Sequence, residues 1–206
     1  MPSTSRATRD GRPLTFTEQA RRAQFVGLTI KVIAEHGYAG CSLQRIADAA
    51  GVTKAAVLYH FASKAALVRA AYQEVISQLT AHVGALVEQA AGPAEAVEAY
   101  IRGLIGHLAA HPDHVRVIVE ALDDDHDTAI PDRPGSPSRW RALAALIDAA
   151  KETRAYRRDV DSRVLAIMIG GAIDALIAES RQDSAFDAAA AAGALVDVVR
   201  RSAGSS

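Results

Sequence analysis

The chain has 206 residues, of which 50% are hydrophobic, 23% are charged and 5% are aromatic, and its formal net charge is −1. This apolar fraction excludes an intrinsically disordered chain, and the length allows one large domain or two small ones. The single cysteine, Cys41, excludes an internal disulfide and a thiolate zinc centre. No apolar stretch follows the basic N-terminus, and the longest apolar run, 164–178, contains Asp174. We therefore expect a cytoplasmic protein without a secretory signal or a membrane span.

The charges are distributed unevenly along the chain. Residues 1–64 contain nine Lys and Arg against four Asp and Glu, a net charge of +5, whereas residues 65–206 carry −6. A basic segment joined to an acidic body is typical of a module that binds a polyanion, attached to a domain with another task.

The first 64 residues predict an arm followed by a three-helix head. Residues 1–14 lack hydrophobic periodicity and are expected to form a mobile basic arm. Thr15 and Glu18 have the spacing of a capping box, which predicts a helix from there to about His36, where Gly37 stops it.

Two short helices should follow. Ser42 is the expected N-cap of a helix over 43–50, and Gly51 suits a left-handed turn after it. Thr53 can then cap a third helix that ends at Tyr59 or His60. Two short helices joined by a tight turn form a helix-turn-helix, and we assign the DNA-binding domain to residues 15–64.

The remaining residues, 65–206, also predict helices, so the fold class is all-α. Helices are expected over 63–90, 94–110, 112–122, 138–154, 162–181 and 184–201, with Pro112 in the first position of its helix. Residues 123–137 contain five acids, three prolines and a glycine, which predicts a loop.

The segment from about 22 to 68 resembles the TetR family of bacterial transcriptional regulators. The residues that carry the resemblance are Gly37-Tyr38, Ser42, Ile46-Ala47, Ala50-Gly51-Val52, Thr53-Lys54, Tyr59-His60-Phe61, Ser63-Lys64 and Leu67. The resemblance implies a DNA-binding head and a larger helical body that dimerises and binds an effector. It also implies DNA contacts, for which the candidates are Ser42, Gln44, Arg45, Thr53, Lys54, Ala55, Tyr59, His60 and Lys64.

Physical chemistry favours particular roles within this set. The hydroxyl of Thr53 and the charge of Lys54 stand at the start of the helix that would enter the major groove. Ser42 begins a helix whose dipole favours a phosphate, and Tyr59, His60 and Lys64 follow the recognition turn, where phosphates pass. Thr53 is also explained as an N-cap, and Lys64 as a solvated lysine.

The chain departs from the family pattern at three positions. Leu58 replaces an aromatic residue that commonly contacts a phosphate, and Ala55 and Ala56 replace a glycine and a hydroxyl residue. Lys54 thereby becomes the main candidate for direct base readout, and phosphates and DNA shape should contribute a larger share. Arg6, Arg9 and Arg12 either enter the minor groove or belong to a tail that makes no contact.

The C-terminal helices are expected to form the dimer interface. The run 164–178 is apolar almost all round and should need cover on more than one side, and Gly170-Gly171 would allow a partner helix to approach closely. An ordinary core helix is the alternative. The candidate interface residues are Val164, Ile167, Gly170, Gly171, Asp174, Leu195 and Val199.

Candidates for the effector pocket lie on apolar helix faces, although structural core is the better explanation for each one taken singly. They are Tyr100, Leu104, His107, Val117, Trp140, Leu143, Ile147, Met168 and Ile169. His107 and Trp140 offer polar handles for a ligand.

The acidic cluster 123–127, with His111 and His114 upstream, raises the question of a metal site. Adjacent side chains rarely converge on one ion, so we expect a solvated loop, no metal and no cofactor. We also find no catalytic constellation, and the chain is not expected to be an enzyme.

The function predicted from the sequence is that of a ligand-responsive homodimeric repressor. It would bind a pseudo-palindromic double-stranded DNA operator and be released by a small apolar or amphipathic molecule, with no membrane partner. Two alternatives rank below it: a DNA- or protein-tethering member of the same fold without an effector, and a helical metal-dependent enzyme.

Overall fold

The computed structural model describes residues 8–9, 12–122 and 139–205. These residues form two compact units, one from the described part of 1–74 with 116–122 and the other from 75–115 with 139–205. The predicted acidic loop falls on residues that are not described. None of the helices in the described ranges is both long and apolar enough to cross a membrane.

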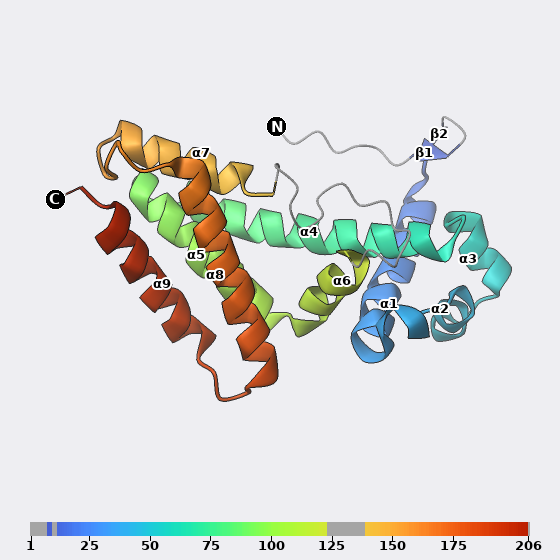
Figure 1. Ribbon diagram of the computed structural model, residues 1–206. Helices are drawn as coiled ribbons and strands as arrows, with labels where there is room; N and C mark the ends of the chain where they lie inside the picture. Colours follow the sequence, from blue (N-terminus) through green and yellow to red (C-terminus); the bar gives the residue numbers. More distant parts are fainter. Residues whose placement is uncertain (1–7, 10–11, 123–138, 206) are drawn as a thin grey trace. The chain divides into compact units, whose positions relative to one another are not determined.

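The first unit contains the predicted helix-turn-helix (Figure 1). Its helices are α1 (Phe16–Gly40), α2 (Leu43–Ala50) and α3 (Lys54–His60), and α4 (Lys64–Glu88) begins in it. Within the segment predicted as an arm, strands β1 (Thr8–Arg9) and β2 (Arg12–Pro13) pair antiparallel. The apolar centre of the unit includes Phe25, Ile33, Ile46 and Val57, each with no exposed surface.

The caps predicted for this unit are confirmed. Thr15 and Glu18 form a capping box, and the side chains of Ser42 and Thr53 accept backbone N–H groups of α2 and α3. Gly51 has the left-handed conformation with φ 67° and ψ 34°. Gly37 interrupts the helical geometry of α1, with φ 67° and ψ 179°, and the chain turns at that point.

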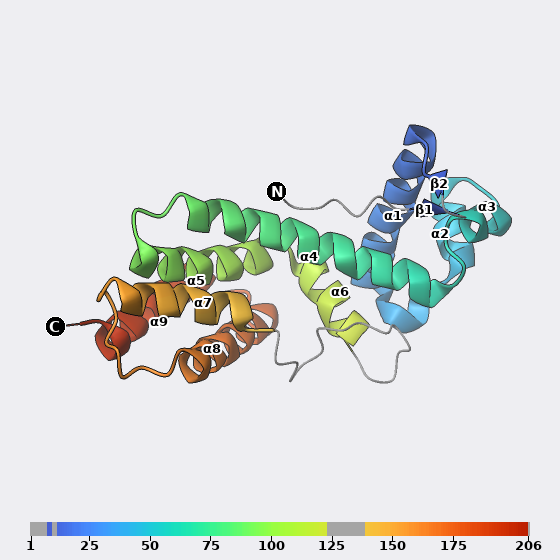
Figure 2. The ribbon, with the colours of Figure 1, turned by 90° about the horizontal axis from the view of Figure 1, so that it is seen from above.

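The second unit is built around α5 (Pro93–Ala110), which packs against α7 (Arg141–Glu152), α8 (Ser162–Gln182) and α9 (Ala188–Ala203). Figure 2 shows α5 beside the second half of α4, where Gly103 leaves room for Val83 and Leu86. The core of the unit includes Ile101, Ile105, Leu143, Ile147 and Val196.

Helix α6 (Pro112–Leu122) completes the described elements. Like α4, it is a continuous helix whose residues belong to both units. The all-α fold class predicted from the sequence is thereby confirmed, with one two-residue ladder in addition.

Candidate DNA-binding surface and body

The N-terminal turn of α3 is an exposed part of the helix-turn-helix. Thr53, Lys54 and Ala55 are all exposed, and Val57, one turn further on, is completely buried and holds the helix against the head. A short helix anchored through its inner face and exposed at its N-terminus has the geometry of a major-groove recognition helix.

Other predicted DNA contacts already have partners in the free chain. The Gln44 amide donates to Asp48 Oδ1 at 2.7 Å, and Arg45 Nη1 donates to the Gly40 carbonyl at 2.6 Å. The Tyr59 hydroxyl, on a side chain that is 52% exposed, lies 3.5 Å from Glu18 Oε1. These three side chains are exposed, as Lys54 is, but they would have to exchange an internal contact for a DNA contact.

Lys64 is half-buried and binds the chain at Tyr38. Its Nζ donates to the Tyr38 carbonyl at 2.5 Å and lies 3.7 Å from the centre of the Tyr38 ring. The Tyr38 N–H donates to Glu120 Oε2 at 3.0 Å. Both backbone groups of Tyr38 are therefore bound by charged side chains, which are among the stronger hydrogen-bond partners.

Sequence reasoning missed Arg22, which ties α1 to the end of α3. Its Nη1 donates to the His60 carbonyl, and its guanidinium lies 4.1 Å from the centre of the Phe61 ring. Burial lowers the pKa of Arg22. His60 also packs against Phe25, with ring centroids 5.5 Å apart, so its ring is part of the head's packing. The partners in these contacts are 35 or more positions apart in the chain, so a local sequence pattern could not have predicted them.

Cys41, next to Ser42, is buried at 2% exposure, and burial raises the pKa of its thiol. A thiol that is buried with a raised pKa is unreactive.

The residues predicted to form an effector pocket lie in several different settings. Leu143, Ile147 and Ile169 are buried in the core of the second unit, and Tyr100, Leu104 and Trp140 pack partly against it. His107 is also buried, whereas Met168 is 65% exposed. Val117 is completely buried but belongs to the first unit.

Trp140 fills the space beside Gly170. A Cβ atom on Gly170 would lie 2.4–2.6 Å from carbons of the Trp140 ring. Arg139 stacks on that ring at 4.6 Å and donates two hydrogen bonds to Asp174, at 2.8 and 2.9 Å. The Asp174 side chain is 52% exposed, and its partial desolvation raises its pKa, a shift that Arg139 opposes.

The remaining predicted interface residues divide between the two faces of their helices. Val164 is 51% and Ile167 is 47% exposed, and Gly171 and Asp174 are exposed beside them. Leu195 is half-buried and Val199 is buried at 2% exposure.

Known proteins resemble this chain both in the sequence of the head and in the fold of most of the chain. Residues 27–71 match the family model described as bacterial regulatory proteins, tetR family. The TetR family member PfmR from Thermus thermophilus superposes with a TM-score of 0.70 and 21% identity, over 86% of this chain and 97% of that one. The head of this chain is therefore similar to the DNA-binding domain of the TetR family.

Two further solved structures have the TetR-family fold of this chain. The fatty acid degradation regulator FadR from Bacillus halodurans gives a TM-score of 0.77 and 21% identity, over 88% of this chain and 95% of that one. FadR from Bacillus subtilis, solved in complex with stearoyl-CoA, gives a TM-score of 0.73 and 18% identity, over 87% of this chain and 97% of that one. No curated protein sequence matches this one. The fold is that of TetR-family transcriptional regulators.

Proposed function

We propose that this protein is a homodimeric transcriptional repressor of the TetR family that a small apolar or amphipathic molecule releases from its operator. The observation that carries the proposal is the exposed N-terminal turn of α3, with Thr53, Lys54 and Ala55, on a head that matches the family model. Thr53 and Lys54 would reach base edges and phosphates, and the Ala55 methyl would contact a thymine methyl.

An apolar stripe on the outer face of α8 supports dimerisation. The inner face of this helix carries Ile169, Ile173 and Ile177 and belongs to the core. At helical spacing on the opposite face, the exposed apolar residues are Val164, Ile167, Met168, Gly171, Ala175 and Ala178, and the charged residues Asp174 and Glu179 border this stripe. Monomeric proteins rarely expose a long apolar stripe of this kind.

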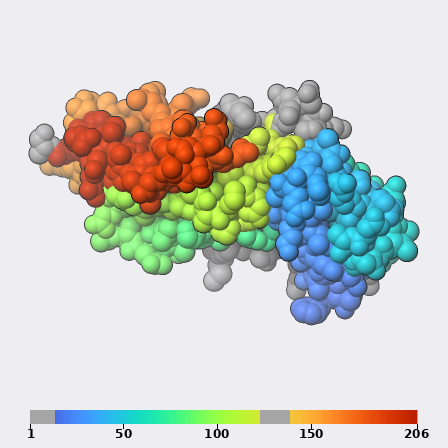
Figure 3. Space-filling view, turned by 90° about the horizontal axis from the view of Figure 1, so that it is seen from below, coloured from blue at the N-terminus to red at the C-terminus, as the bar shows by residue number. Residues whose placement is uncertain are grey.

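Helix α9 extends this surface. Val198 is 52% exposed, and Ala194 lies one turn before it on the same face. Figure 3 shows α8 and α9 side by side on one face of the second unit. Because α8 and α9 also pack together within the chain, the two helices from each of two protomers would form a four-helix contact. Gly170 would contribute indirectly, since Trp140 covers it.

The proposal places the effector in the second unit. The Bacillus subtilis relative was solved with stearoyl-CoA, so this fold can hold a molecule with a long acyl chain. Helices α4 and α6 contribute residues to both units, which makes them the elements through which a ligand would act on the head. Such a ligand must bind the DNA-incompetent state more tightly than the DNA-bound state.

The experiment that tests the proposal follows the oligomeric state and DNA binding of one set of proteins. Sedimentation should give a dimer for the wild-type chain and a monomer for Ile167→Glu, because a carboxylate would be buried in the stripe. Ala185→Glu, at an exposed position between α8 and α9, is the matched control and should remain dimeric.

The same variants should differ on DNA. Fragments from upstream of the protein's own coding sequence, or selected from genomic fragments, should bind wild type and Ala185→Glu and bind Ile167→Glu more weakly, since two half-sites must be engaged together. The proposal would be contradicted if the wild-type chain were monomeric, or if Ile167→Glu bound DNA as tightly as the wild type.

A further inference from the structure

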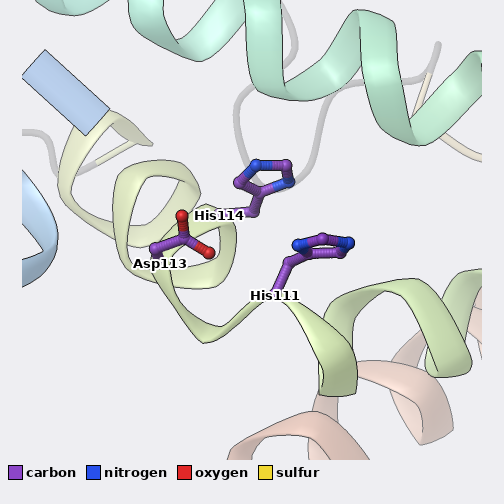
Figure 4. A group of neighbouring side chains, drawn as sticks. All are labelled: His111, Asp113 and His114. Atoms are coloured by element: carbon purple, nitrogen blue, oxygen red, sulfur yellow. The ribbon is translucent and has the colours of Figure 1, made fainter. Parts of the chain in front are cut away.

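A group of histidines surrounds the junction between α5 and α6. Figure 4 shows His111, Asp113 and His114, whose ligand atoms all lie within 4.8 Å of one another. His111 is exposed, Asp113 is half-buried and His114 is buried. All three belong to the second unit, and none of them has a role in the proposed DNA-binding or dimerisation surfaces.

The backbone of the junction brings these side chains together. His111 caps the C-terminus of α5, where its N–H donates to the His107 carbonyl, and Pro112 begins α6. The His114 N–H donates to the His111 carbonyl at 3.0 Å, which closes the turn. The rings of His111 and His114 consequently stack, with centroids 4.7 Å apart and planes 18° from parallel.

A second layer of imidazoles supports this group. His107 Nε2 lies 3.2 Å from His114 Nδ1, a hydrogen bond between two buried rings. The ring of His82, from α4, lies 5.2 Å from that of His107. Metal-binding histidines almost always use their second ring nitrogen in a hydrogen bond, usually to a carboxylate, a carbonyl or water, which fixes the tautomer and the ring orientation. His107 takes that place for His114.

We propose that His111, Asp113 and His114 bind a divalent transition-metal ion of the Zn²⁺ type, and that His107 positions His114 behind them. Two imidazoles and one carboxylate are a ligand set for Zn²⁺ and its neighbours in the first transition row, and imidazole disfavours Mg²⁺ and Ca²⁺. Three protein ligands leave a fourth position for water or another small ligand.

The geometry requires only a small adjustment. Bonds of about 2.0–2.1 Å around a tetrahedral ion place ligand atoms roughly 3.3 Å apart. The present separations reach at most 4.8 Å, and the exposed His111 side chain has room to turn toward the other two. The buried His114, held by His107, would stay in place while His111 closes on the ion.

The test titrates Zn²⁺ into the untagged, chelator-treated full-length chain by calorimetry, with Co²⁺ absorption as a second readout. We expect one ion per chain, and His111→Ala should weaken binding by at least about tenfold because it removes a ligand. His36→Ala is the matched control, since His36 is an exposed histidine of α1 with Glu35 only 3.6 Å away. It should bind as wild type does.

A second variant, Asp113→Asn, and the melting temperature provide independent tests of the metal site. Asp113→Asn preserves the size of the side chain and should also bind Zn²⁺ more weakly than the wild type. It replaces His111→Ala as the test variant if circular dichroism shows that His111→Ala is poorly folded. Zn²⁺ should raise the melting temperature of wild type and His36→Ala but not of the two site variants. Wild-type binding that neither site variant weakens, or no stoichiometric binding by wild type, would overturn the proposal. DNA binding enters none of these readouts, so the repressor proposal stands or falls separately.

Discussion

The backbone N–H of Tyr38 donates a hydrogen bond to Glu120 at 3.0 Å, although the two residues are 82 positions apart in the chain. On the other side of the same residue, Lys64 binds the Tyr38 carbonyl. The chain segment at the end of α1 is thus held by a carboxylate from α6 and an ammonium from α4, within one unit.

Replacing Glu120 by Gln should therefore destabilise the first unit. The amide keeps the size of the carboxylate but loses the charge-assisted hydrogen bond to Tyr38 and the ion pair with Arg116. We expect the free energy of unfolding to fall by about 1–2 kcal/mol in urea denaturation. Glu35→Gln, at an exposed position of α1, is the control and should change it by less than about 0.5 kcal/mol. Equal effects of the two variants would argue against the contact.

Gly37 should tolerate no side chain. Its backbone has φ 67° and ψ 179°, and a Cβ atom there would lie 3.0 Å from Glu120 Oε1. Gly37→Ala should cost about 1–3 kcal/mol in unfolding free energy, mainly from backbone strain. Gly51→Asn is the control, because Gly51 has the left-handed geometry that Asn also adopts and meets nothing within 4 Å. A Gly37→Ala variant as stable as Gly51→Asn would contradict this account.

Gly170→Ala should displace the Trp140 ring. The added methyl group would lie 2.4–2.6 Å from three ring carbons, so either the ring or helix α8 has to move. The free energy of unfolding should fall by about 1–3 kcal/mol. Tryptophan fluorescence should also change, since Trp140 is the chain's one tryptophan. Gly106→Ala, in α5 with open space around the new methyl group, should instead stabilise its helix by about 0.5–1 kcal/mol.

The stability of the second unit should depend on pH through His107. Burial, and then the neighbouring His111, His114 and His82, lower the pKa of His107 from 6.5 to about 4, while Asp113 opposes the shift. The unfolded chain therefore binds more protons between these values. The contribution of neutral His107 to the free energy of unfolding is fully present above about pH 6.5 and is lost as the pH falls toward 4. The loss should be on the order of 1–3 kcal/mol.

His107→Gln tests this dependence because glutamine does not titrate. In metal-free buffer, urea unfolding of the wild type should weaken from pH 7 to pH 5 more steeply than that of His107→Gln. His36→Gln, at an exposed position outside the cluster, should follow the wild type. Parallel pH profiles for wild type and His107→Gln would contradict the lowered pKa.

Features with local causes could be predicted from the sequence. The caps at Thr15, Ser42 and Thr53 and the turn at Gly51 depend on residues within four positions of each other, and the structure has them. Helix α9 was expected from 184 but begins at Ala188, because Asp187 supplies its N-cap.

Features that depend on tertiary contacts could not be predicted. Gly170 was predicted to admit a partner helix, but its space is taken by Trp140, which lies 30 positions earlier in the chain. Arg22 and Glu120 were missed for the same reason, since their partners are far away in sequence. His111 and His114 were noticed beside an acidic run, whereas their grouping with Asp113, His107 and His82 depends on how α4, α5 and α6 meet.

DNA binding through the first turn of α3 is the central claim, and Lys54 tests it most directly. Fluorescence anisotropy on a selected operator fragment, at two salt concentrations, should show tight, salt-sensitive binding by the wild-type chain. Lys54→Ala should weaken it by about 1–3 kcal/mol, whereas Lys31→Ala, which removes an exposed lysine from α1, should leave it nearly unchanged. Equal affinities of the two variants, or binding to any DNA with the same affinity, would contradict the assignment of α3 as the recognition helix.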